Sequence, residues 1–313
     1  MEKIAFVFPG QGSQTVGMGQ AMAMQNERAK RIFEKADETL GFSLSQVIFE
    51  GPQETLTLTT NAQPALLTTS IALLKGLEEA GIRPDYTAGH SLGEYSALVA
   101  SGSLDFQDAV YAVRKRGEYM EEAVPSGEGT MAAILGMDRN ALHVICQKVT
   151  EAGDSVQLAN MNCPGQIVIS GTVAGVHKAA DMAKEAGAKR VLPLQVSGPF
   201  HSVLMKPAAE KFKTVLDGIQ VKDAEIPVVV NVTAAPAADS ATIREKLIEQ
   251  LYSPVLWEDT VEKLITLGVG TFVEIGPGKV LSGLIRKVDR NVKTLPVQDP
   301  ESLHAAVAAL RGK

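Results

Sequence analysis

Short apolar runs alternate with longer stretches in which apolar residues recur every three or four positions. The first run, at residues 4–8, predicts a buried strand, and helical periodicity follows at residues 20–40, 59–80 and about 105–122. Further strands are expected near the end of the chain, at residues 226–232 and 271–275. Because short buried strands separated by helices are typical of parallel sheets, we expect a parallel sheet with helices on both faces.

The middle of the chain has a different order of elements. Between turn-rich segments at residues 125–129 and 197–199, the pattern predicts strand, helix, strand, strand, helix, strand. These elements are expected at residues 131–136, 138–151, 156–162, 166–170, 173–186 and 190–196. That order is the signature of a ferredoxin-like unit. We therefore expect an α/β protein in which residues 1–126 and 197–313 form a large α/β-hydrolase-like subdomain, and residues 127–196 form an inserted small ferredoxin-like (βαββαβ) subdomain.

Composition narrows the class of protein. The 313 residues are 45% hydrophobic and 21% charged, with a formal net charge of -6, so no basic stripe is available for nucleic acid. The two cysteines, Cys146 and Cys163, lack the paired spacing of a metal site and favour a reducing compartment. Neither a signal-peptide pattern nor a long apolar span is present, so we expect a cytoplasmic protein that does not enter a membrane. A monomer is the default expectation, since no sequence pattern indicates the oligomeric state.

One pentapeptide carries candidate chemistry. Residues 89–93 read Gly-His-Ser-Leu-Gly, between an apolar run and a helix-forming run that begins at Glu94. A G-x-S-x-G sequence in a strand, turn and helix context is typical of a serine nucleophile, here Ser91. Its hydroxyl would lie at a helix N-terminus, which favours a developing anion. A pattern with three fixed positions also arises often by chance, so the partners of Ser91 decide its role.

A serine nucleophile needs a base, and histidine is the usual one. Four of the five histidines either adjoin Ser91 or lie in predicted helices: His90, His143, His177 and His304. His201 differs because it closes a loop after a strand, where the inserted unit rejoins the larger one, and catalytic groups concentrate on such loops. We favour His201 as the base. The pattern identifies no acidic third member, and a backbone carbonyl could orient the ring instead.

A candidate binding group lies on the helix predicted at residues 105–122. Arg116 falls at the edge of its apolar stripe, where a planar guanidinium could hold a substrate carboxylate. An arginine in that position is more often one that covers apolar surface while its charge stays in water. Two glycine-rich segments, at residues 10–15 and 276–280, lack positions that the dinucleotide and phosphate-loop motifs require.

Motifs along the whole chain resemble those of one family. They are Phe8-Pro9-Gly10-Gln11-Gly12-Ser13-Gln14, Ala62-Gln63-Pro64-Ala65, Gly89-His90-Ser91-Leu92-Gly93-Glu94, Arg116-Gly117 with Met120, Gly198-Pro199-Phe200-His201-Ser202, Asn231-Val232, Gln250 ahead of Ser253-Pro254-Val255, and Glu274-x-Gly276-Pro277-Gly278. In this order they resemble the malonyl-CoA:acyl carrier protein transacylases, the stand-alone acyltransferases of fatty acid and polyketide synthesis.

The resemblance implies roles for single residues. Ser91 would attack the malonyl thioester, with His201 as base and the backbone carbonyl of Gln250 orienting the imidazole. The backbone N–H groups of Gln11 and Leu92 would hold the oxyanion. Further residues implied in substrate binding are Arg116, which would hold the malonyl carboxylate, Phe200, which goes with malonyl selection in related modular acyltransferases, Gln250, Met120, Gln63 and Asn231.

The implied activity is transfer of malonyl from malonyl-CoA to the phosphopantetheine thiol of acyl carrier protein by a ping-pong route. No cofactor and no metal are expected, and the partners are malonyl-CoA and acyl carrier protein. Two alternatives share some of these features. A serine esterase or thioesterase would use the same Ser91 and His201, and a non-catalytic nucleotide- or carrier-binding module would use neither.

Overall fold

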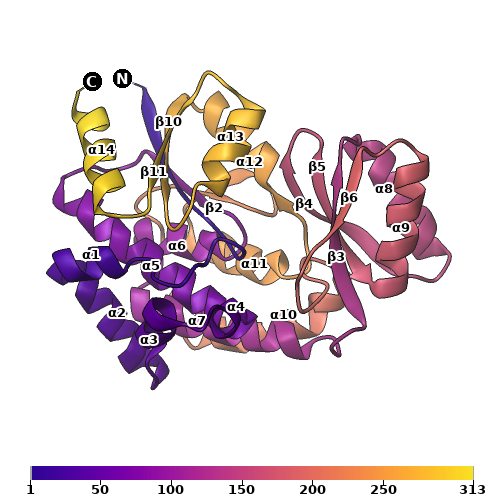
Figure 1. Ribbon diagram of the computed structural model, residues 1–313, viewed down its shortest axis with the longest axis horizontal. Coiled ribbons are helices and arrows are strands. Elements are labelled where there is room, and N and C mark those ends of the chain that lie inside the picture. Colours follow the sequence, from indigo (N-terminus) through magenta and orange to yellow (C-terminus); the bar gives the residue numbers. More distant parts are fainter. Residues whose placement is uncertain (1, 313) are drawn as a thin grey trace.

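The computed structural model describes residues 2–312 and contains two β-sheets (Figure 1). The larger sheet has the strand order β11-β10-β1-β2-β7-β8. Its strands are β1 (Lys3–Phe8), β2 (Tyr86–Gly89), β7 (Val228–Val230), β8 (Ala235–Ala237), β10 (Val269–Ile275) and β11 (Lys293–Val297). Neighbouring strands from β11 to β7 are parallel, as the sequence predicts, and only the edge strand β8 is antiparallel to its neighbour.

Helices cover both faces of this sheet, and the alternation along β1 shows why. Phe6 and Phe8 point into a core built with helices α5 (Thr59–Glu79), α6 (Gly93–Ala100), α7 (Phe106–Glu122) and α10 (Lys206–Asp217). The intervening residues, Ala5 and Val7, face α12 (Trp257–Thr266) and α13 (Val280–Val288). A strand that is apolar on both sides is buried on both sides, which confirms the two-sided cover predicted for the sheet.

Several helices depart from the predicted boundaries. Residues 20–40 form two helices, α1 (Gln20–Gln25) and α2 (Glu27–Leu40), so the single helix predicted there is wrong. Asn26 separates them because its side chain accepts a hydrogen bond from the Ala29 backbone N–H at 2.8 Å and caps α2. Three other helices were outside the predictions: α3 (Leu44–Glu50), α4 (Gln53–Thr57) and α14 (Pro300–Arg311). Helix α11 (Ser240–Gln250) lies between β8 and β10 in the chain.

The smaller sheet has the order β6-β3-β5-β4-β9. Its strands are β3 (Gly129–Leu135), β4 (Val156–Cys163), β5 (Gln166–Thr172), β6 (Arg190–Pro193) and β9 (Val255–Leu256), and two helices, α8 (Arg139–Glu151) and α9 (Val173–Glu185), belong to the same unit. The first four strands follow the order of a βαββαβ unit. The last of them is shorter than the predicted 190–196, and β9 comes from outside residues 127–196, where it pairs in parallel with β4.

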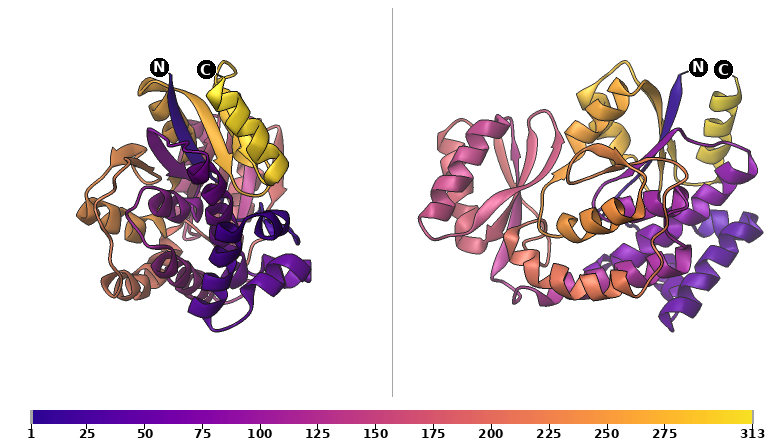
Figure 2. Two further views of the ribbon diagram at one scale, coloured as in Figure 1. Left: turned by 90° about the vertical axis from the view of Figure 1, so that its left-hand side faces the viewer. Right: turned by 180° about the vertical axis from the view of Figure 1, so that it is seen from behind.

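The smaller sheet uses its two faces differently. Ala132 and Ile134 of β3 pack with α8 and α9, whereas Met131 and Ala133 join the core of the larger unit. This sheet therefore presents one face to its own helices and the other to the rest of the molecule, as the opposite views of Figure 1 and Figure 2 show.

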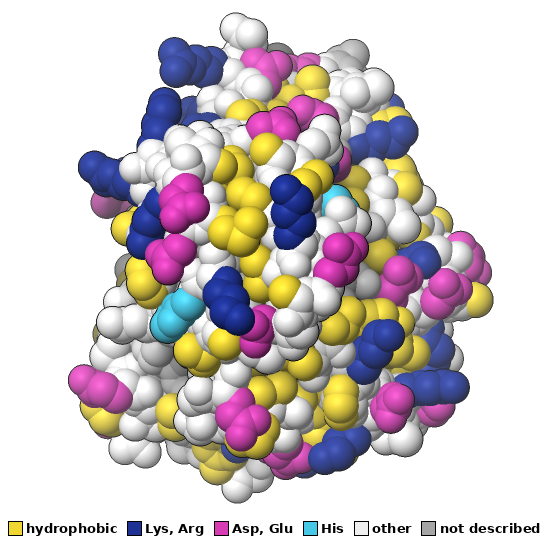
Figure 3. Space-filling model, turned by 90° about the vertical axis from the view of Figure 1, so that its right-hand side faces the viewer, with side chains coloured by type: hydrophobic (Ala, Val, Ile, Leu, Met, Phe, Trp, Pro, Cys, Tyr) yellow, Lys and Arg dark blue, Asp and Glu magenta, His cyan; other side chains and the backbone are white. Residues whose placement is uncertain are grey.

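The two ends of the chain lie side by side at one end of the larger sheet (Figures 1 and 2). On the part of the small unit's outer side that the structure describes, charges of both signs are mixed with apolar side chains (Figure 3). None of the helices within residues 2–312 is both long enough and apolar enough to cross a membrane.

Candidate active site

Ser91 lies in the tight turn between strand β2 and helix α6. Its backbone φ is 51°, a left-handed value that is uncommon for a residue with a side chain. The flanking glycines make this turn possible, because a Cβ on Gly93 would lie 2.0 Å from the Phe8 carbonyl oxygen and one on Gly89 1.9 Å from the Gly93 carbonyl carbon. The strand, turn and helix context predicted from the sequence is confirmed.

His201 meets Ser91 although 110 residues separate them. The Ser91 Oγ lies 2.8 Å from His201 Nε2, and His201 Nδ1 lies 2.8 Å from the backbone carbonyl oxygen of Gln250. A carbonyl only accepts, so Nδ1 carries the proton and Nε2 is free to accept one from the serine. Burial, and after it the nearby positive charge of Arg116, lowers the pKa of His201 to about 3. The imidazole is therefore neutral near pH 7 and able to act as a base.

The loop that carries His201 is held by the smaller sheet. The Gln157 side chain, on β4, donates from Nε2 to the His201 carbonyl oxygen at 3.2 Å and accepts from the Val203 backbone N–H at 2.8 Å. Sequence reasoning missed Gln157, since a glutamine within a strand carries no motif. His201 itself has a φ of 58°, so these contacts stabilise a left-handed backbone.

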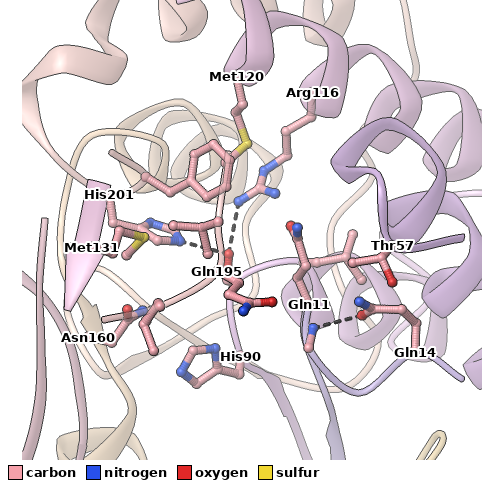
Figure 4. Close-up of a pocket in the computed structure, with 16 residues that line it drawn as sticks. Gln11, Gln14, Thr57, His90, Arg116, Met120, Met131, Asn160, Gln195 and His201 are labelled. Atoms are coloured by element: carbon pink, nitrogen blue, oxygen red, sulfur yellow. Dashed lines mark hydrogen bonds between the residues drawn. The ribbon is translucent and has the colours of Figure 1, made fainter. Parts of the chain in front are cut away.

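Arg116 enters the same site from helix α7 and is only 1% exposed. An arginine that merely covers apolar surface would keep its guanidinium in water, so that interpretation of Arg116 is wrong. Nη1 donates to Gln63 Oε1 at 2.8 Å, and Nη2 donates to Gln250 Oε1 at 2.9 Å and to Ser91 Oγ at 3.1 Å. His201 and Arg116 thus converge on one hydroxyl from different elements (Figure 4).

Three of the predicted binding residues, Gln63, Gln250 and Asn231, are fully buried behind the pocket wall. Gln63 and Gln250 hold the Arg116 guanidinium. Asn231 brackets the turn: its Oδ1 accepts from the Ser91 backbone N–H at 2.8 Å, and its Nδ2 donates to the Gly89 carbonyl oxygen at 2.6 Å. The structure brings all three to the site as supports of Ser91 and Arg116.

A cavity of about 290 Å³ opens above Ser91. Its lining includes the other predicted residues, Gln11, Leu92, Met120, Phe200, Arg116 and His201. The smaller sheet and the loop after it add Met131, Asn160 and Gln195 (Figure 4). Leu194 and Val196, from the same loop, also line the cavity. His90 also lines the cavity, and its Nε2 lies 2.8 Å from Asn162 Oδ1 on β4. Burial lowers the pKa of the His90 imidazole. The cavity residues of the smaller sheet, Met131 and Asn160, were not predicted from the sequence.

Within residues 2–312, no group of three or more His, Cys, Asp or Glu side chains is arranged to hold a metal ion. The groups that face Ser91 Oγ are an imidazole and a guanidinium. These can accept a proton and hold an anion without a bound cofactor.

A strand, turn and helix that place a half-buried serine beside a buried histidine form a site that can carry out acyl transfer through the serine. The model of the acyl transferase domain family matches residues 5–304, so the chain belongs to that family.

Individual relatives are similar over nearly the full length. The chain is 65% identical over 311 residues to the malonyl CoA-acyl carrier protein transacylase of Bacillus subtilis (strain 168). The aligned region covers 99% of this chain and 98% of that protein. The solved structure of the malonyl CoA-acyl carrier protein transacylase from Coxiella burnetii has a TM-score of 0.96 at 41% identity and covers 99% of this chain and 98% of that one. A malonyl-transacylase in complex with a type II PKS acyl-carrier protein has a TM-score of 0.95 at 44% identity and covers 98% of this chain and 99% of that one.

Proposed function

We propose that the protein transfers the malonyl group from malonyl-CoA to the phosphopantetheine thiol of acyl carrier protein, for fatty acid or polyketide synthesis. The observation that carries this proposal is that Ser91 Oγ lies within hydrogen-bond distance of both a neutral imidazole and a buried guanidinium. The first pair supplies an activated nucleophile, and the second supplies a positive charge suited to the free carboxylate of a malonyl group. Relatives whose names state this activity support the assignment.

The first half-reaction acylates the serine. Ser91 Oγ attacks the thioester carbon while its proton passes to His201 Nε2. The negative oxygen of the tetrahedral intermediate would be held by the backbone N–H groups of Gln11 and Leu92, both in the cavity wall. Leu92 is the N-cap of α6, where the helix dipole also favours the anion. One such donor contributes about 2.7–4 kcal/mol to lowering a barrier of this kind.

The bond to sulfur then breaks, and CoA leaves as the thiol with the proton from His201. In the second half-reaction the thiol of acyl carrier protein gives its proton to His201 and attacks the malonyl ester, and Ser91 recovers its proton. Each proton taken up by His201 is returned, so the protein ends the cycle unchanged. Phe200 and Met120 line the cavity and would contact the acyl group.

The setting of this reaction is part of the proposal. We place the enzyme in the cytoplasm as a monomer that needs no cofactor, with residues 1–126 and 197–313 as the catalytic unit and residues 127–196 as the insertion. Both cysteines are free and buried, which agrees with a reducing compartment.

Intact-mass measurement tests the proposal. Incubation with malonyl-CoA should add the mass of one malonyl group to the protein, and Ser91→Ala should remove the adduct. Acyl carrier protein should discharge the adduct quickly and water slowly. Fast discharge by water would instead indicate a thioesterase, and the lack of any adduct would indicate a non-catalytic binding module.

A further inference from the structure

Two buried charges beneath Ser91 lack a directly bonded partner of opposite sign. Arg116 donates its three hydrogen bonds to the neutral oxygens of Gln63, Ser91 and Gln250, and its Nε has no partner within the described chain. Glu94, on α6, has no exposed surface. Its Oε2 accepts from the Asn231 backbone N–H at 2.7 Å, whereas its Oε1 is buried without a partner among residues 2–312.

An isolated charge in a protein interior is costly, so a buried cation and a buried anion near each other are each stabilised by the other. Glu94 and Arg116 attract each other electrostatically. The Gln250 side chain accepts a hydrogen bond from Arg116 and also stabilises the charged form of the Glu94 carboxylate. Burial nevertheless dominates and raises the pKa of Glu94 to about 7. The carboxylate is therefore held at the border between its charged and neutral forms.

The other groups around Glu94 are neutral near pH 7. From α6 itself comes Tyr95, whose pKa is raised by burial, and the segments after β7 and at the end of α11 contribute the amides Asn231 and Gln250. Both His90 and His201 line the cavity, and burial lowers the pKa of each, so both imidazoles are uncharged near pH 7. Among the described groups that act on Glu94, Arg116 on α7 is thus the positive charge.

We propose that Glu94 is a positioning residue that serves as the internal counter-charge of Arg116 and takes up a proton when a malonyl carboxylate binds there. This inference rests on the proposed function, because it needs the substrate carboxylate to lie against Arg116. A second negative charge in the same buried region repels the first and favours the neutral acid. The proton comes from solvent and can settle on Oε1, while Oε2 keeps its bond to Asn231.

The coupling has a direct consequence for affinity. Below pH 7, Glu94 is already neutral, and the malonyl carboxylate binds to an Arg116 whose charge has no other carboxylate to neutralise. Above pH 7, binding must first draw a proton onto Glu94, so affinity falls as the pH rises. An ionised Glu94 would therefore lower the affinity of the site for the malonyl group and favour transfer of that group to the thiol of acyl carrier protein.

Calorimetry on Ser91→Ala, which binds malonyl-CoA without reacting, measures the coupling. Titrations at pH 7 in buffers of different ionisation enthalpy should show uptake of about half a proton per malonyl-CoA bound, and the Kd should be up to about tenfold weaker at pH 8 than at pH 6. Acetyl-CoA has the same phosphates and no carboxylate, so it should show neither effect. Equal proton uptake with the two ligands would overturn the inference, even if Glu94 variants fail to fold.

The double variant Ser91→Ala with Glu94→Gln assigns the proton to a residue. Glutamine keeps an oxygen that can accept from the Asn231 N–H, so proton uptake and the pH dependence of the Kd should both disappear. Uptake that persists would place the proton on His90 or His201 and would refute the role of Glu94. Ser91→Ala with Arg116→Ala separates the two proposals: unchanged binding of malonyl-CoA there would disprove the carboxylate site itself.

Discussion

His201 is held in an environment that keeps its imidazole neutral. Burial lowers its pKa to about 3, and the charge of Arg116 acts in the same direction. The Gln250 carbonyl, 2.8 Å from Nδ1, selects the tautomer whose Nε2 faces Ser91. A ring prepared in this way does not have to lose a proton to solvent before it can act as the proposed base.

This environment predicts an unusual pH profile for acylation. A histidine of ordinary pKa would be mostly protonated at pH 5, and the rate would fall about thirtyfold between pH 7.5 and pH 5. Because the pKa of His201 lies below that range, the neutral base persists and we expect less than about a twofold change. Rapid-quench measurement of malonyl-Ser91 formation at saturating malonyl-CoA checks this. A fall with a midpoint near pH 6.5 would show that His201 titrates normally.

Arg116 predicts selectivity for acyl groups that carry a carboxylate. Arg116→Ala removes a charge-assisted contact worth about 1.5–3 kcal/mol, so kcat/KM for malonyl transfer should fall about 10- to 100-fold. Transfer of the neutral acetyl group should change little. Arg114→Ala is the matched control, since Arg114 lies on the same helix and bonds Glu118, Asn61 and the Thr60 carbonyl outside the cavity. Equal losses with the two substrates would argue against a carboxylate clamp.

At the scale of elements, the turn between β2 and α6 depends on close backbone contact. Helix α6 begins so near the end of β1 that only glycine fits at position 93. The Asn231 side chain then fixes the turn, because it makes hydrogen bonds with the backbone of Gly89 and of Ser91, the residues before and after His90. The position of Ser91 is therefore set by three elements, β1, β2 and the segment after β7.

Gly93→Ala should accordingly be damaging. A Cβ 2.0 Å from the Phe8 oxygen forces α6 away from β1, which should destabilise the fold by about 1–3 kcal/mol and remove most of the acylation rate. Gly283→Ala is the matched control within α13, where a Cβ would meet nothing within 4 Å, and it should be neutral or stabilise by up to about 1 kcal/mol. Urea unfolding and adduct formation measure both effects. A fully active Gly93→Ala protein would contradict the packing argument.

Local signals explain which elements could be predicted. The strand, turn and helix at Ser91 follow from apolar runs and glycine spacing, which need no distant contact. Strand β9 has two residues, Val255 and Leu256, and becomes a strand only by pairing with β4, so no periodicity could reveal it. Likewise, the alternation of side chains along β3 places Met131 and Ala132 on opposite faces of the sheet. That alternation does not show which of the two faces lines a cavity.

At the scale of the whole molecule, the cavity needs both sheets. The larger unit supplies Ser91, His201 and Arg116, and the smaller sheet supplies Met131 and Asn160. Pairing of β9 with β4 connects the two units, and so does a two-point ion pair from Arg139 at the start of α8 to Asp259 on α12, with N···O distances of 2.6 and 3.0 Å.

The ion pair predicts a difference between stability and activity. Both side chains are about a third exposed, so Arg139→Ala should cost no more than about 1 kcal/mol of stability. A small shift between cavity walls matters more, and kcat/KM should fall about three- to tenfold. Lys184→Ala breaks an exposed pair within α9 and should change neither quantity. Unchanged activity in Arg139→Ala would mean that the sheets and their packing alone fix the orientation.

The hydrogen bond of 3.1 Å between Arg116 Nη2 and Ser91 Oγ also sets a length scale. In the proposed intermediate the acyl chain starts at Ser91 and its far end must return to a guanidinium beside that starting point. A single methylene between carbonyl and carboxylate allows this return, whereas a longer dicarboxylic chain would overshoot. The distance between Ser91 Oγ and the Arg116 guanidinium therefore selects an acyl group by the length of its chain as well as by its charge.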